Sequence, residues 1–281
     1  ARGFKSHFLR QNKNKYRKYI NNQEHIKVFK RREKIMNKII KNKINKGIVL
    51  AIIVLSFGLS LSIMLKYKTE GETNMPFTLK KIQTISSAEA TTKSENPENY
   101  KWNIDINQYN DIYIELQKNP ESDLISYIEQ ITLENSEIKS KNSENIKIYM
   151  PNSTEGKRFI YEDNFKVEGA LTYKGASESN EKTLSIANQG GTILFRVLNQ
   201  NISEYYSNED EEMMYDGRLL EKSNVNLEDT KIILSFDIII QTDKIKYKGR
   251  ITLELPTGDI KKEGVTTKTI ENFENIVFKR M

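Results

Sequence analysis

The sequence contains no cysteine and only two histidines, His7 and His25. The absence of cysteine excludes disulfides, thiol catalysis, lipid attachment through an N-terminal cysteine and zinc sites with cysteine ligands. Both histidines precede a long apolar run, so the chain beyond that run has no imidazole for proton transfer or metal ligation. Hydrolases that depend on histidine are therefore excluded for that part of the chain, and we expect no cofactor.

Charge of the two signs is distributed unevenly along the 281 residues. Residues 1–35 hold 12 basic and 2 acidic residues, and residues 36–47 hold 4 lysines and no acid. Residues 66–281 hold 28 basic and 36 acidic residues, a net charge of −8. A basic chain would normally suggest nucleic acid as a partner, but an acidic domain repels phosphate. We therefore expect no nucleic acid partner.

The first 35 residues show no apolar period that could build a core. Met36 opens a basic stub, residues 36–47, that leads directly into the apolar run, and Lys30 to Glu33 can be encoded as a purine-rich ribosome-binding sequence. One hypothesis is that residues 1–35 are translated leader sequence. The alternative is a basic, disordered cytoplasmic tail that binds anionic lipid. A tryptic peptide from before Met36 in the native protein would exclude the leader.

An uncharged apolar run of 18 residues extends from Ile48 to Leu65. As an α-helix it spans roughly 27 Å, close to the hydrocarbon thickness of a bilayer. Because the run is apolar on every face, a buried core helix is disfavoured. A cleaved signal peptide is also disfavoured, since the run is too long and no small-x-small pair follows it closely. The residues predicted to span the membrane are Ile48, Leu50, Ile53, Leu55, Phe57, Leu59, Leu61, Ile63 and Leu65.

The lysines around this run predict its orientation. Four of them precede it in residues 36–47, whereas Lys66 and Lys68 after it are soon accompanied by Glu70 and Glu72. The positive-inside rule then places the N-terminus in the cytoplasm and the larger domain outside the cell. We expect a single-pass protein of the cell membrane, with membrane lipid as the partner of residues 48–65.

Residues 66–99 have the polar, Ser- and Glu-rich composition of a solvated tether, although residues 77–85 could instead form a first short strand. From residue 100 to residue 281 apolar and polar residues alternate, which predicts strands. The clearest pair covers residues 232–240 and 245–255 on either side of Thr242-Asp243-Lys244, and it predicts a β-hairpin with one buried and one wet face.

Further strands are predicted at residues 102–106, 112–116, 128–133, 146–150, 165–173, 192–198 and 275–278. Eight or more short strands separated by polar turns favour a β-sandwich, and their combined length suffices for one core. The predicted fold is therefore mainly β: an N-terminal transmembrane helix, a polar tether and an antiparallel β-sandwich-like domain over residues 100–281.

An acidic segment could collect oxygen ligands for calcium through Glu209, Asp210, Glu212 and Asp216. It lacks the regular spacing and the glycine of a calcium loop, so a solvated acidic turn is the favoured interpretation. Gly190-Gly191 precedes a strand and not a helix, which indicates a turn and not a phosphate-binding loop.

Two further kinds of site have a plainer interpretation. Pairs among the 36 acids could cleave glycosides, but charges on strand faces and loops are the favoured interpretation. Trp102, Tyr109 and Tyr113 could form an aromatic platform for sugars, but packing within an early hairpin is favoured. The sequence thus assigns no catalytic, cofactor-binding or metal site.

The segment from Trp102 to Ile114 (WNIDINQYNDIYI) follows a lysine-rich stub, a single helix and a Ser/Glu tether. This pattern resembles uncharacterised single-pass membrane-anchored proteins with extracytoplasmic β-domains from clostridia-like, low-GC Gram-positive bacteria. The resemblance covers residues 36–281 loosely, contains no catalytic motif and implies no activity.

We expect a non-enzymatic cell-envelope protein whose β-domain binds an envelope protein or a glycan, or supports an assembly. A pilin-like subunit is a structural variant, but Ile52 stands where a pilin would have glutamate. A transmembrane signalling regulator of anti-sigma type is one alternative, and it requires residues 1–46 to be a cytoplasmic module. A carboxylate-dependent, wall-active glycosidase is the other.

Overall fold

The structure is a computed structural model that describes residues 3–92, 102–152, 157–179, 183–207, 219–256 and 258–281. The chain divides into two compact units, residues 1–68 and residues 69–281. The prediction of a mainly β protein is confirmed, because one long N-terminal helix is followed by two β-sheets.

The first unit is formed by one long helix, α1, which spans Gly3–Glu70 and so ends just inside the second unit. Between Gly3 and Gly47 the sequence contains no glycine and no proline, the two residues that cost most inside a helix. Nothing therefore interrupts the helix over its basic part. The structure describes residues 3–35 as part of this helix, and the choice between a translated leader and a basic cytoplasmic tail stays a prediction.

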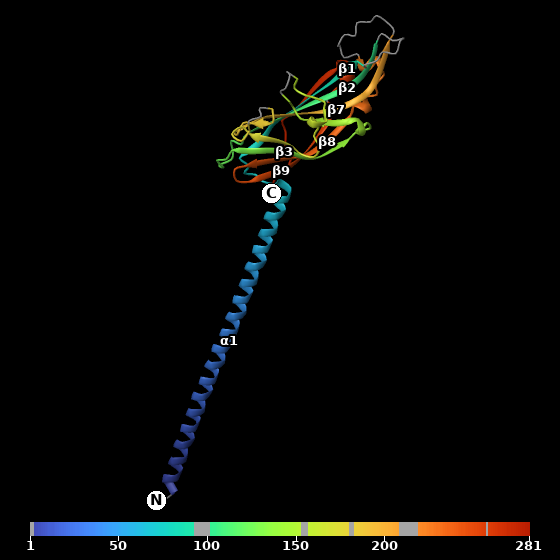
Figure 1. The fold of residues 1–281 in the computed structure, drawn as a ribbon. Helices are drawn as coiled ribbons and strands as arrows, with labels where there is room; N and C mark the ends of the chain where they lie inside the picture. Colours follow the sequence, from blue (N-terminus) through green and yellow to red (C-terminus); the bar gives the residue numbers. More distant parts are fainter. Residues whose placement is uncertain (1–2, 93–101, 153–156, 180–182, 208–218, 257) are drawn as a thin grey trace. The chain divides into compact units, whose positions relative to one another are not determined.

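The second unit contains a five-stranded and a six-stranded sheet (Figure 1). The five-stranded sheet has the order β10-β1-β2-β7-β4 and is antiparallel throughout. Its strands are β1 (Phe77–Thr92), β2 (Trp102–Lys118), β4 (Ile146–Tyr149), β7 (Gly190–Ser207) and β10 (Val265–Ile270).

The six-stranded sheet has the order β11-β9-β8-β3-β5-β6, in which the pair β5–β6 is parallel. Its strands are β3 (Ile128–Lys139), β5 (Leu171–Gly175), β6 (Ser185–Ile186), β8 (Ile232–Thr242), β9 (Lys246–Leu255) and β11 (Lys279–Arg280). Among the connections are short helices, namely α2 (Leu219–Lys222), α3 (Leu227–Thr230), α4 (Ile260–Glu263) and the 3₁₀ turns Ser143–Asn145 and Asp163–Phe165.

Strand β1 corrects the predicted tether. The β unit begins at residue 69 and not at residue 100, and β1 pairs with β2 from Phe77↔Lys118 to Thr92↔Ile104. Its second half is rich in Ser, Ala and Thr, a composition that predicted a solvated linker. Ser86 and Ala88 are nevertheless buried, because Ser86 bonds the side chain of Asn110 and Ala88 packs in an apolar cluster with Leu220 of α2 and Ile260 of α4. Residues 93–99 lie outside the described residues.

The hairpin predicted near the end of the chain is confirmed. Strands β8 and β9 pair from Ile232↔Leu255 to Gln241↔Lys246, with the turn at residues 242–245. Two other predicted strands are wrong in position. Over residues 165–173 only the last three are strand, since Gly169 has a φ of 96° and interrupts the alternation. Residues 275–278 form a loop that packs Phe278 on the core, and the strand follows them as β11.

Both sheets contribute side chains to one core. The rings of Phe195 on β7 and Phe236 on β8 meet edge to face with centroids 5.6 Å apart. The hydroxyl of Tyr173 on β5 donates a hydrogen bond of 2.5 Å to the carbonyl oxygen of Leu194 on β7. The inward rows of β1, β2 and β7 thus pack on those of β3, β8 and β9, which are all antiparallel strands.

A buried polar network fixes the five-stranded sheet near a bulge in β2 and β7. The side chain of Asn199 donates to Gln108, at 3.1 Å, and the side chain of Asn110 accepts from Ser86 and from Gln108. Gln108 also donates to the backbone of Thr230 at the end of α3. Because buried amides must be hydrogen-bonded, this network joins β1, β2, β7 and α3 in one arrangement.

Candidate functional site

The nine side chains predicted to span the membrane all lie on α1, and all are exposed, between 47% for Leu61 and 70% for Phe57. One helix near the N-terminus is long and apolar enough to cross a membrane, and none of that stretch is buried. Burial of a large apolar side chain contributes about 1.5–3 kcal/mol of hydrophobic free energy, so leaving nine of them in water loses roughly 14–27 kcal/mol of stabilisation. The hydroxyl of Ser56 donates a hydrogen bond to the carbonyl of Ile53, and that of Ser60 donates one to the carbonyl of Ser56. These two hydroxyls are therefore satisfied within the helix.

The predicted acidic candidates Glu209, Asp210, Glu212 and Asp216 lie outside the described residues. Within the described part of the chain, no group of three or more acidic or histidine side chains could hold a metal ion. The turn expected at Gly190-Gly191 lies slightly earlier, at residues 187–190, where the Gly190 amide bonds the carbonyl of Ala187, and the two glycines are the first residues of β7.

A carboxylate cluster of the six-stranded sheet is centred on Asp237 of β8. Burial alone would raise the pKa of Asp237, but hydrogen bonds from Asn135, Lys248 and Arg250 outweigh it and lower that pKa. Lys248 also bonds Glu134, at 3.0 Å, so one ammonium joins both carboxylates. A glycosidase needs one carboxylic acid with a raised pKa. The pKa of Asp237 is shifted in the opposite direction, so this cluster gives no support to the glycosidase alternative.

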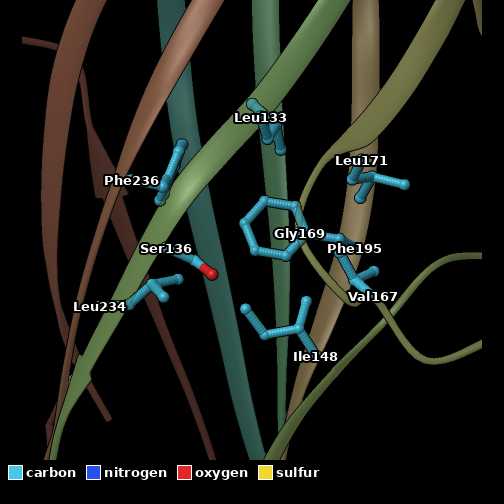
Figure 2. Close-up of a pocket in the computed structure, with 9 residues that line it drawn as sticks. All are labelled: Leu133, Ser136, Ile148, Val167, Gly169, Leu171, Phe195, Leu234 and Phe236. Carbon is cyan, nitrogen blue, oxygen red and sulfur yellow. The ribbon is translucent and has the colours of Figure 1, made fainter.

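A small cavity lies between the two sheets, as Figure 2 shows. Its lining is apolar except for one serine and consists of Leu133, Ser136, Ile148, Val167, Gly169, Leu171, Phe195, Leu234 and Phe236. The cavity volume is about 20 Å³. That is room for about one water molecule, far below the hundreds of cubic ångströms of a ligand site. We interpret it as a packing gap where the loop around Gly169 replaces a strand.

A larger cleft of about 280 Å³ lies beside β9. One wall is formed by four consecutive residues, Arg250 to Leu253, and the other by Ile270 and the loop 272–276, with Ile82 also in the lining. We call it the β9-edge cleft. Its volume is close to the lower limit for small-molecule sites.

The polarity of the β9-edge cleft comes from a free strand edge. Strand β11 pairs with β9 only at Tyr247 and Lys248, so residues 249–254 pair with β8 alone among the described strands. In an antiparallel strand every second residue directs its N–H and C=O away from a given neighbour. Those groups of β9 therefore point toward the cleft, whose far wall adds the amide side chains of Asn272 and Asn275.

An aromatic cluster with one arginine covers the outer face of the five-stranded sheet. Arg196 on β7 bonds both oxygens of Asp111 on β2, at 2.5 and 2.8 Å, and also bonds the hydroxyl of Tyr161. Its guanidinium lies 4.3 Å from the ring centre of Phe159 and 4.9 Å from that of Tyr109. All three nitrogens of Arg196 are therefore bonded within the chain. The cluster attaches the loop 157–165 to the sheet and does not offer a free cation.

Burial explains the electrostatics of this cluster. It raises the pKa of Tyr161 to about 12, although Arg196 acts in the opposite direction, and it also raises the pKa of Tyr109. Both hydroxyls are therefore neutral at physiological pH. The packing interpretation of Tyr109 is confirmed, because only 7% of it is exposed. Tyr113 is bonded through its hydroxyl by Arg158, and the side chain of Trp102 lies outside the described residues.

Sequence reasoning missed both features, for different reasons. Arg196 carried a signal, since it is the one charge in the apolar run from Ile193 to Leu198 and such a charge needs a buried partner. The β9-edge cleft left no signal in the sequence, because a strand edge is free only where no other strand pairs with it, and local sequence patterns do not show which strands pair. Neither models of protein families nor curated proteins nor solved structures gave a match to this chain.

Proposed function

We propose that the chain is a single-pass protein of the cell membrane, with its N-terminus in the cytoplasm and its β unit on the outer side as a two-layer sandwich. The observation that supports this proposal is the 18-residue stretch of α1 that has no charge and no buried face. Only a hydrocarbon environment or a large apolar partner removes such a surface from water. The lysines in residues 36–47 favour the inward orientation of the N-terminus.

The anchoring is tested in bacterial cells that express the full chain with an N-terminal tag. We expect carbonate-washed membranes to retain the protein, and we expect protease added to spheroplasts to digest the β unit while sparing the tag. Paired substitution L55R and L59R should move the protein out of the membrane, since each arginine at the centre costs about 2.5–3.5 kcal/mol. The matched control, N42R with N45R, adds the same charge outside the apolar run and should leave the protein in place.

Retention of the L55R and L59R variant in washed membranes would contradict the anchor. Protection of the β unit from external protease, with digestion of the tag, would contradict the orientation while leaving the anchor intact. The two parts of the proposal are therefore tested separately.

Within the anchored protein, we propose a non-enzymatic binding role for the β9-edge cleft, toward an extended polypeptide such as a segment of an envelope protein. The supporting observation is the free edge of residues 249–254 beside a cleft of about 280 Å³. An extended chain supplies the complementary N–H and C=O groups at the same spacing, as in strand addition to other sheet edges. A compact rigid ligand would leave part of that backbone edge unbonded.

This role is tested with a library of random phage-displayed peptides, selected on the full chain in lipid nanodiscs. We expect the selected peptides to lose about ten-fold or more in affinity, equivalent to about 1.4 kcal/mol, for the variant N275W, whose indole fills the cleft. The control variant N164W places the same side chain on an exposed turn and should bind as the wild type does. Equal affinity for all three proteins would refute the cleft as the binding surface.

A further inference from the structure

One end of the β unit gathers the loops next to the point where the chain leaves for α1. Strand β1 begins opposite the end of β2, at Phe77↔Lys118, and β3 begins opposite the end of β8, at Ile128↔Thr242. The segment 69–76, the loop 119–127 and the turn 243–245 consequently share this end. We call these three segments the proximal rim.

The proximal rim presents an isoleucine to solvent. Ile125 is 82% exposed, more than any other large apolar side chain in the described residues, and Tyr127 beside it is 41% exposed. Single exposed apolar residues are common on protein surfaces, so the exposure of Ile125 alone carries no inference. This isoleucine lies on a loop that hydrogen bonds hold in place.

Those bonds attach the loop to the two neighbouring segments of the rim. Ser122 donates to the side chain of Asn74, at 2.7 Å, and the ammonium of Lys244 donates to the carbonyl of Ile125, at 2.8 Å. The carboxylate of Asp243 accepts from the hydroxyl of Ser126 and from the backbone amide of Tyr127. The outward position of Ile125 is thus fixed by the fold.

Chain connection alone limits how far the rim can lie from the apolar run. The run ends at Leu65, the helix continues to Glu70, and the amide of Glu72 is already bonded to the carbonyl of Phe278 in the β unit. Five residues of helix and two of extended chain span roughly 15 Å. The headgroup region is about 5–8 Å thick on each side of the hydrocarbon core. No long tether separates the rim from a membrane crossed by residues 48–65.

Charge next to Ile125 is mixed. Exposed cations stand at Lys118, Lys244 and Lys246, and exposed acids stand on the loop itself at Glu121 and Asp123. Cations favour an anionic lipid surface, whereas the two acids oppose it. The apolar side chain, and not net charge, therefore decides which surface this rim fits.

We propose that Ile125, with Tyr127 beside it, inserts into the lipid headgroup region and holds the proximal rim against the bilayer. This inference rests on the proposed membrane anchoring. An isoleucine and a tyrosine are suited to this depth, because one is apolar throughout and the other has an apolar ring with a polar tip. The β9-edge cleft then lies on a domain held close to the membrane and not on a long flexible tether.

The absence of cysteine makes a site-specific test direct. The variants I125C, I233C and F57C of the full chain are labelled with a polarity-sensitive fluorophore and placed in vesicles of zwitterionic and anionic phospholipid. Ile233 is the matched control, because it is 40% exposed and pairs with Lys139, nine residues along β8 from the rim. At about 3.3 Å per residue the control lies roughly 30 Å farther away. Phe57 reports on the anchor.

We expect lipid that carries a nitroxide quencher in its headgroup region to reduce the emission at position 125 about two-fold or more, for burial ~5–10 Å deep. Emission at position 233 should be unchanged. Equal quenching at 125 and 233, with position 57 shielded from a water-soluble quencher, would overturn the inference and leave the anchor standing. Position 57 open to the water-soluble quencher would overturn the anchor and, with it, this inference.

Discussion

Tyr173 allows the contact between the two sheets to be tested by removing one oxygen atom. It lies on β5 with 0% of its surface exposed, and its hydroxyl donates to the carbonyl oxygen of Leu194 on β7, at 2.5 Å. Burial raises the pKa of Tyr173, so the hydroxyl keeps its proton at any physiological pH and acts as a donor. The substitution Y173F keeps the ring in the core and deletes this one donor.

The size of the effect follows from the surroundings of the Leu194 carbonyl. Strand β4 pairs with β7 only from Arg196 to Asn199, so β4 gives Leu194 no ladder partner on that side and Tyr173 supplies one from the other sheet. Loss of a net hydrogen bond costs about 0.5–1.5 kcal/mol, and a carbonyl left without a partner costs about 1–3 kcal/mol. We therefore expect Y173F to reduce the free energy of unfolding by about 1–3 kcal/mol. For a unit of this size that corresponds to a fall in Tm of roughly 2–12 °C.

The assay is scanning calorimetry of the full chain in lipid nanodiscs, where α1 keeps its apolar surroundings. The control is Y127F, which removes a hydroxyl from a tyrosine that is 41% exposed, and it should change stability by less than about 0.5 kcal/mol. If Y173F melts at the same temperature as the wild type and Y127F, the hydroxyl does not link the sheets. The assignment of one shared core would then rest on apolar packing alone.

Three further predictions concern other parts of the β unit. Replacing Arg196 with lysine removes the bidentate pair of hydrogen bonds to Asp111 and should reduce the free energy of unfolding by about 1–3 kcal/mol in calorimetry. An unchanged melting curve would mean that this ion pair does not contribute to stability. Because the pKa of Asp237 is lowered below 3.8, its contribution is present at pH 5 and above and is lost as the pH falls through the folded-state pKa. The variant D237N should therefore be less stable at pH 7 in denaturant titrations and lose less stability below pH 4, and parallel pH profiles would contradict this. Replacing Gly190 with alanine places a Cβ 2.7 Å from a backbone oxygen of β2 at a φ of 114°. This change should lower the melting temperature more than the same change at Gly169, where φ is 96° and no atom lies within 4 Å of the added Cβ. Equal melting temperatures would show that the clash is relieved.

Alternation of apolar residues predicted most of the sheet positions. Strands β2, β3, β7 and β8 contain the segments predicted for them, and β4 and β9 match their predicted segments to within one residue, because each strand has one face on the core. Strand β1 was only partly predicted, since the burial of Ser86 and Ala88 depends on Asn110 and on the short helices α2 and α4, which are distant in sequence. The segment at 165–173 was misassigned because its first residues contact β4 through a few isolated backbone hydrogen bonds and do not form a continuous strand pairing.

Composition and short-range pattern were enough to predict the apolar run at residues 48–65, the excess of lysine before it and the paired rows of β8 and β9. These are properties of composition and short-range period, which no distant contact needs to complete. Tertiary structure decided that Arg196 meets Asp111 across two strands, that β9 is left with a free edge beside a cleft, and that Ile125 is held outward by Lys244. Each of these features depends on a contact between residues at least 85 positions apart or on a strand edge that stays unpaired. Neither can be predicted from a pattern within a short stretch of sequence.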